Sequence, residues 1–200
     1  MRACFFGDSF VNGTGDDDCL GWVGRLCAAE RRSGRDLTVY NLGVRRDTSG
    51  DILRRWRPEA EARLPPDCGG RLVFSFGLND CWFNDQGSGP RLAKDVTLAN
   101  ARSILGQAAT WLPTLMIGPL PVTDDAARNE SVIQLSQVLG ELCSELDTPF
   151  LSVIPVVGAL YPRWRAEAEA GDGIHPNRAS YAALAEWIHT SEAWRDWIRS

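Results

Sequence analysis

Short apolar runs alternate along this sequence with longer segments of helical periodicity, and this alternation is the strongest constraint on the fold. The runs are rich in β-branched or aromatic residues and lack apolar–polar alternation, which is typical of strands buried on both faces of a parallel sheet. They occupy positions 3–6, 37–42, 72–76, 115–117 and 150–153. Strands that alternate with helices predict an α/β protein, a three-layer sandwich with right-handed crossovers.

Helical spacing of apolar residues fills most of the segments between these runs. It predicts helices at 21–32, 49–63, 91–111 and 125–146, and a last helix that starts near Asn177. Positions 156–171 are predicted to be irregular. Because no repeat, low-complexity tract or linker interrupts the chain, we expect a single domain over residues 1–200.

The last ten residues carry a stripe of large apolar side chains. Trp194, Trp197 and Ile198 follow the i, i+3, i+4 spacing of one helix face. We expect this stripe to dock on the domain, with a contact in a homo-oligomer as the alternative.

The composition excludes several classes of protein. The chain is 44% hydrophobic and 24% charged, which is too apolar for a disordered protein, and it has no stretch of about 18 apolar residues that could span a membrane. Its net charge of −5 argues against a nucleic-acid partner, which requires a basic surface. The apolar run at 3–6 is too short for a signal peptide, so we expect a cytoplasmic protein.

Residues with catalytic potential follow the predicted strands. In an open parallel sheet, ligands bind outside the carboxyl ends of the strands. Ser9 follows the first strand, Gly43 the second and Asn79 the third, while Asp172 and His175 precede the last helix. We therefore expect a hydroxyl, a glycine, an amide, a carboxylate and an imidazole to converge on one edge of the sheet.

This set of groups has the chemistry of a nucleophilic hydrolase. A serine hydroxyl is a weak nucleophile until a base within hydrogen-bond reach removes its proton. His175 can act as that base if Asp172, three residues before it, holds the second ring nitrogen as a donor. The main-chain N–H groups of Ser9 and Gly43 and the side chain of Asn79 could then stabilise the oxyanion of a tetrahedral intermediate.

Together these residues resemble the four sequence blocks of the GDSL, or SGNH, hydrolase family. The blocks occur in the family's order over nearly the whole chain, as Gly7-Asp8-Ser9-Phe10, Gly43, Gly77-Leu78-Asn79-Asp80 and Asp172-Gly173-Ile174-His175. The resemblance, closest to small bacterial GDSL esterases or lipases, implies a flavodoxin-like parallel sheet of about five strands. It also implies ester hydrolysis with no metal or organic cofactor.

The resemblance also implies a role for each matched residue. It gives Ser9 as nucleophile, His175 as base and Asp172 as its partner, with an oxyanion hole made by Ser9, Gly43 and Asn79. Phe10 stands where the family name has leucine, so we expect an altered packing contact and intact chemistry.

Each of these residues also has a purely structural interpretation. Serine after a strand is a good helix cap, asparagine forms Asx turns, and glycine is common in the turn that ends a strand. The joint occurrence of the four blocks favours catalysis for Ser9, Asp172, His175 and Asn79. For Asp80 and Asp8 we expect a structural role.

The residues around the blocks leave some interpretations open. Trp82 and Phe83 directly follow the third block, where either could line the acyl pocket or pack in the core. Arg45 and Arg46 could bind a substrate carboxylate or phosphate, although a solvent-facing pair is favoured. The acidic run at 16–18 is interpreted as a solvated loop, and no metal site is predicted.

The sequence therefore predicts a serine esterase that hydrolyses carboxylic esters through an acyl-enzyme. Its partner is a small-molecule ester, and short-chain acyl or acetyl esters are favoured because no insertion is long enough for a large lid. The alternatives are a thioesterase, a lysophospholipase or an acyltransferase with the same three residues. A non-catalytic, anion-binding flavodoxin-like module is the alternative from a different class.

Overall fold

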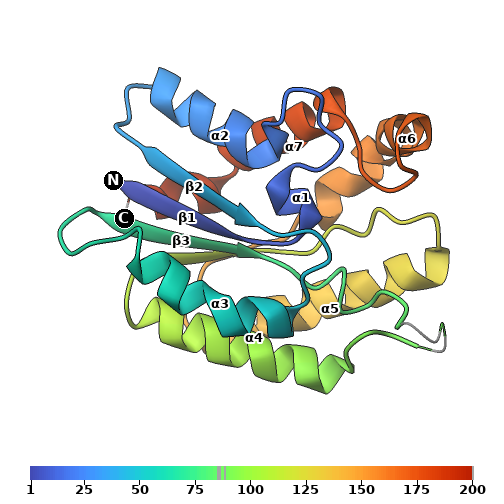
Figure 1. Cartoon of the computed structure of the whole chain (residues 1–200), viewed down its shortest axis with the longest axis horizontal. Helices are drawn as coiled ribbons and strands as arrows, with labels where there is room; N and C mark the ends of the chain where they lie inside the picture. The colour runs from blue at the N-terminus through green and yellow to red at the C-terminus, as the bar shows by residue number, and fades with distance from the viewer. Residues whose placement is uncertain (85–86, 88, 200) are drawn as a thin grey trace.

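A parallel β-sheet runs through the centre of the molecule, with helices on both of its faces (Figure 1). The computed structural model describes residues 1–84, 87 and 89–199. Within them the sheet has the strand order β2-β1-β3-β4-β5, and every neighbouring pair is parallel. The strands are β1 (Arg2–Gly7), β2 (Thr38–Gly43), β3 (Gly70–Ser75), β4 (Thr114–Ile117) and β5 (Phe150–Leu151). The predicted three-layer sandwich is thus confirmed.

The helices form one layer on each side of this sheet (Figure 1). One layer contains α1 (Ser9–Asn12), α2 (Gly21–Arg32), α6 (Ile154–Ala170) and α7 (Arg178–Thr190), and the other contains α3 (Ser49–Glu61), α4 (Lys94–Ala109) and α5 (Ala126–Glu145). Successive strand side chains point to opposite faces, so Phe5 joins the core under the first layer and Phe6 the core under the second.

Two expectations about these elements are wrong. The run at 37–42 forms β2 as predicted, but it is not buried on both faces of the sheet. β2 is an edge strand with one neighbour, and Val39 is 37% exposed on it. The stretch 156–171 is not irregular, because residues 156–170 belong to α6 and Gly171 is its C-cap. Pro155 lies in the first turn, where no N–H is needed, and only Val157, Trp164 and Ala168 are buried, so the helical pattern is sparse.

The strand register brings three loops to one edge of the sheet. Gly7, the last residue of β1, pairs with Gly43 on one side and with Ser75 on the other. The chain then turns at Asp8, whose carboxylate accepts the N–H of Phe10 at 2.9 Å and caps α1. Ser9 is therefore the first residue of a short helix that begins directly at the strand end.

The C-terminal helix α8 (Glu192–Trp197) is docked as predicted. Trp194, Trp197 and Ile198 are buried in the same core as Phe5. The indole N–H of Trp194 donates to Glu30 at 2.7 Å, which joins α8 to α2. Among the described residues, none of the helices has the length and apolar character needed to cross a bilayer.

We infer that residues 1–200 unfold as one domain, because both cores share one sheet and the last helix packs into one of them. Replacement Trp194→Ala empties a fully buried site and should lower the free energy of unfolding by about 3–5 kcal/mol. Urea unfolding followed by fluorescence and circular dichroism measures this. The half-buried Trp187 provides the matched control, since Trp187→Ala should cost less than about 2 kcal/mol. Two separate transitions would contradict the single domain.

Candidate active site

Ser9, His175 and Asp172 form a continuous chain of hydrogen bonds at the carboxyl edge of the sheet. The Oγ of Ser9 lies 2.8 Å from Nε2 of His175, and Nδ1 of the same ring lies 2.7 Å from Oδ2 of Asp172. Ser9 comes from the start of α1, and the other two come from the turn between α6 and α7. The structure therefore brings together the three residues that the sequence singles out as nucleophile, base and partner.

A compact turn holds the imidazole in this position. The second carboxylate oxygen of Asp172 accepts the main-chain N–H groups of Ile174 at 3.1 Å and His175 at 2.9 Å. Gly173 has φ +84°, a left-handed conformation that suits glycine. Glu167 on α6 accepts the N–H of Asn177 at 2.8 Å, so the turn is anchored at the start of α7 as well.

The environment sets the protonation of this pair. Burial alone would raise the pKa of Asp172, but donors from the His175 main chain, the His175 ring and the Ile174 main chain outweigh it and hold the pKa at about 2. Burial lowers the pKa of His175, and the adjacent carboxylate opposes this only in part. A neutral imidazole beside an ionised carboxylate is therefore the state at neutral pH, as a general base requires.

Phe10 and Asp8 contact the residues around this chain of hydrogen bonds. The ring of Phe10 lies 5.0 Å from the His175 ring and 5.6 Å from Trp164, centroid to centroid, so it packs directly on the imidazole. Asp8 is buried, and burial raises its pKa to about 7, with Asp80 and Asp47 adding to the rise. Its bond to the Phe10 N–H is structural, as expected from the sequence.

Asn79 lies beside Ser9 in the same pocket. Its Nδ2 donates to the main-chain carbonyl of Asp47 at 3.0 Å, which leaves the second hydrogen of the amide for another acceptor. The adjacent Asp80 accepts from the main-chain N–H of Ser49 at 3.0 Å and from the Thr97 hydroxyl at 2.9 Å. Asp80 thus joins the loop after β3 to α3 and α4.

Gly43 is not brought to this pocket. Its N–H donates to the side chain of Asn41 at 3.0 Å, so it has no donor to offer an oxyanion beside Ser9. A Cβ at this position would lie 2.1 Å from the main-chain nitrogen of Asn12, so the close approach of α1 explains the glycine. Three residues further on, Arg46 lines the pocket and has a left-handed backbone, with φ 70°.

The pocket around Ser9 has a volume of about 300 Å³. Trp82 lines it, as one of its two open interpretations proposed. Arg45 and Arg46 also line it, in agreement with the less favoured of their two interpretations, as do three residues that sequence reasoning gave no site role: Leu78, Ile174 and Arg91. The sequence leaves the role of Arg45 and Arg46 open, because a charged loop residue gives no signal of which way it faces.

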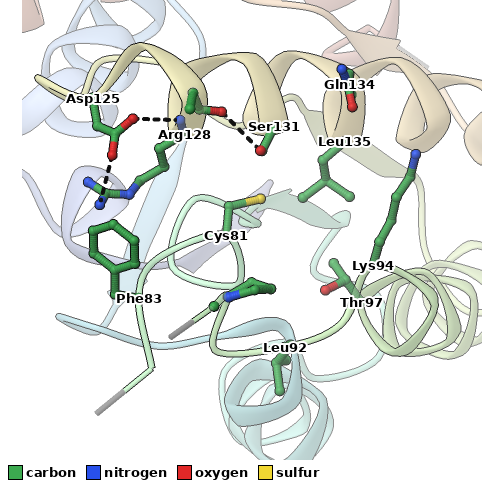
Figure 2. Close-up of a pocket in the computed structure, with 13 residues that line it drawn as sticks. Cys81, Phe83, Leu92, Lys94, Thr97, Asp125, Arg128, Ser131, Gln134 and Leu135 are labelled. Atoms are coloured by element: carbon green, nitrogen blue, oxygen red, sulfur yellow. Dashed lines mark hydrogen bonds and ion pairs between the residues drawn. The ribbon is translucent and has the colours of Figure 1, made fainter. Parts of the chain in front are cut away.

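Phe83 lines a different cavity, of about 340 Å³, between α4 and α5 (Figure 2). The guanidinium of Arg128 lies 4.1 Å from the Trp82 ring centroid and 4.2 Å from that of Phe83, and forms the contact between the two side chains. Phe83 is 47% exposed. Trp82 therefore lines the pocket of Ser9, whereas Phe83 lines the other cavity.

The acidic run at 16–18 is not simply a solvated loop, because Asp16 is buried. Its carboxylate accepts the N–H of Gly21 at 2.7 Å and pairs with Arg25, which fixes the start of α2. Within the described residues, no three His, Cys, Asp or Glu side chains are grouped to hold a metal ion.

Comparison with known proteins places this site in a family. The family model for the GDSL-like lipase/acylhydrolase family matches residues 5–183. The chain belongs to the GDSL-like lipase/acylhydrolase family. As a member it is an ester-hydrolysing enzyme, and its substrates are small-molecule carboxylic esters. No match was found among curated proteins.

Solved structures share the fold of this GDSL family member at low sequence identity. An acetylxylan esterase from Geobacillus stearothermophilus is 20% identical, with a TM-score of 0.76 over 96% of this chain and 95% of the other. An α/β hydrolase from the metagenome of Lake Arreo, Spain, is also 20% identical, with a TM-score of 0.77 over 97% and 94%. These likenesses agree with the fold described above.

The His175–Asp172 contact predicts a measurable titration. His175 should titrate below its ordinary pKa of about 6.5, and Asp172→Asn should lower its pKa further, because the carboxylate is what opposes the effect of burial. NMR of the imidazole resonances over pH measures both values. His189, the only other histidine in the sequence, is the internal reference. A His175 pKa that is normal or insensitive to Asp172→Asn would contradict this geometry.

Proposed function

We propose that this enzyme is a serine esterase in which Ser9 forms the acyl-enzyme, His175 is the general base and Asp172 orients the imidazole. The observation that carries the proposal is the hydrogen-bond chain from Asp172 through His175 to Ser9, at 2.7 and 2.8 Å. These are the distances at which a base can take a proton from a hydroxyl nucleophile.

The reaction follows from these positions. Ser9 Oγ attacks the ester carbonyl carbon while its proton passes to Nε2 of His175, and the carbonyl oxygen becomes an oxyanion. The imidazolium then donates that proton to the leaving alcohol, which gives the acyl-enzyme. A water molecule, deprotonated by the same nitrogen, attacks the acyl carbon. The imidazolium then returns the proton to Ser9 Oγ as the acid is released. Asp172 stays ionised and stabilises the imidazolium at each step.

The oxyanion needs donors aimed at one point next to Ser9. The N–H of Ser9 is available because it is in the first turn of α1, where no helical acceptor exists. The free hydrogen of the Asn79 amide is the second donor. For the third we propose the main-chain N–H of Arg46 in place of that of Gly43, since Arg46 lines the pocket and Gly43 donates to Asn41.

The pocket favours short acyl groups. Bulky side chains line its roughly 300 Å³, among them Phe10, Leu78 and Trp82, of which the first two are buried and have little freedom to move aside. Acetylxylan esterases share this fold, and acetyl esters are therefore the first members of a substrate series to test. A cytoplasmic location, as expected from the sequence, is part of the proposal.

Replacement Ser9→Ala tests the function directly. It removes the hydroxyl nucleophile and adds no atoms that could clash, so the fold should be retained. The kcat for p-nitrophenyl acetate should fall by about 10⁴- to 10⁶-fold. A series of p-nitrophenyl esters of increasing acyl length should show kcat/KM falling beyond the short chains. Turnover by Ser9→Ala at the wild-type rate would refute the role of Ser9, and equal rates across the series would refute the acyl preference.

A further inference from the structure

Three arginines surround the pocket of Ser9, and the ester hydrolysis proposed above gives their side chains no task. Arg45, Arg46 and Arg91 all line this pocket. The chain as a whole carries a net charge of −5, so a concentration of positive charge at this opening is a local feature. A local positive field raises the concentration of anions at a pocket even when the whole protein repels them.

Arg46 and Arg91 make no ion pair within the described part of the chain, although carboxylates lie nearby. Asp47 is paired at 2.7 Å with Arg55, which also donates to main-chain carbonyls. Among the described residues, no carboxylate at ion-pair distance therefore competes with a bound anion for these two guanidinium groups.

The contact of Arg45 with the protein is weak. Its guanidinium lies 3.5 Å from Asp172, and its side chain is 61% exposed. The same carboxylate oxygen already accepts from His175 at 2.7 Å. Exposed ion pairs of this kind contribute little to stability, so the ion pair with Asp172 does not explain the presence of an arginine at position 45.

Arg46 occupies a backbone position that is unfavourable for arginine. Its φ of 70° is left-handed, a conformation that is unfavourable for a residue with a Cβ. The guanidinium of Arg91 donates to the main-chain carbonyl oxygen of Arg46 at 2.6 Å and so connects the loop after β3 to the turn at Arg46. Strained positions of this kind concentrate at ligand-binding sites. The hydrogen bond holds the Arg91 guanidinium against the backbone of Arg46, and both residues line the same pocket.

We propose that this enzyme selects esters that carry a second, anionic group near the ester bond, and that the side chains of Arg46 and Arg91 bind that group. The guanidinium presents planar N–H donors that match a carboxylate, sulfate or phosphate. The inference deepens the proposed function and rests on it, because the pocket is the one in which Ser9 attacks the ester.

The test uses three acetyl esters that carry meta substituents of different charge on one phenyl ring. They are meta-acetoxybenzoate, which is anionic, meta-acetoxybenzamide, which is neutral, and meta-(trimethylammonio)phenyl acetate, which is cationic. For each enzyme the quantity compared is the ratio of kcat/KM for the anionic ester to kcat/KM for the neutral one. Comparing this ratio between variants cancels the intrinsic reactivity of the esters.

The ratio should fall about ten-fold in Arg46→Gln and in Arg91→Gln, the lower end for loss of a charge-assisted hydrogen bond. Arg91→Glu should favour the cationic ester. In the wild type the ratio should also fall between about 0.05 M and about 0.5 M NaCl. Arg32→Gln is the matched control, because it removes one exposed charge at the end of α2, at the opposite edge of the sheet, and should leave the ratio unchanged.

The outcomes separate this inference from the function on which it rests. If Ser9-dependent hydrolysis of the neutral ester is intact but the ratio is the same in the pocket variants as in Arg32→Gln, charge selection is refuted and the esterase stands. If no ester shows Ser9-dependent turnover, the proposed function fails and this inference with it. Thermal unfolding of each variant identifies any loss that is due to misfolding.

Discussion

The hydrogen bond between Asp172 and His175 is the interaction on which the rest of the site depends. Imidazole keeps a lone pair for the Ser9 hydroxyl on Nε2 only while Nδ1–H donates to the carboxylate. Ser9 and His175, which the hydrogen bond at Nε2 joins, are 166 residues apart in the chain. Ser9 lies at the carboxyl edge of the sheet because it follows β1, and the turn between α6 and α7 brings His175 to the same edge.

Buried carboxylates away from the reacting atoms hold that edge in shape. Asp8 directly precedes Ser9 and caps α1, and Asp80 directly follows Asn79 and accepts from Ser49 on α3. Burial raises the pKa of both acids, and such a group is tolerated only when donors surround it. The bonds that satisfy each carboxylate therefore also fix its neighbour, which is the candidate nucleophile in one case and the candidate oxyanion donor in the other.

Sequence reasoning reaches the parts of this structure that depend on chain order and short spacing. The three-layer arrangement and the turn that holds Asp172 and His175 follow from local patterns. Ser9, Asp172 and His175 could therefore be named as candidates in advance. Orientation within loops could not. Gly43 and Arg46 lie three residues apart, and only the backbone reveals that the glycine N–H is occupied and that the arginine is left-handed. The helix α6 escapes prediction because it carries Pro162 and buries only a narrow stripe.

The central claim is that His175 makes Ser9 a nucleophile, and covalent labelling tests it most directly. A fluorophosphonate reacts with an activated serine, and the account predicts one phosphonyl group per chain, on Ser9, located by mass spectrometry of peptides. The labelling rate should fall by at least about 10³-fold in His175→Ala, because the base is lost. Labelling of another residue, or labelling of Ser9 at an unchanged rate without His175, would contradict the account.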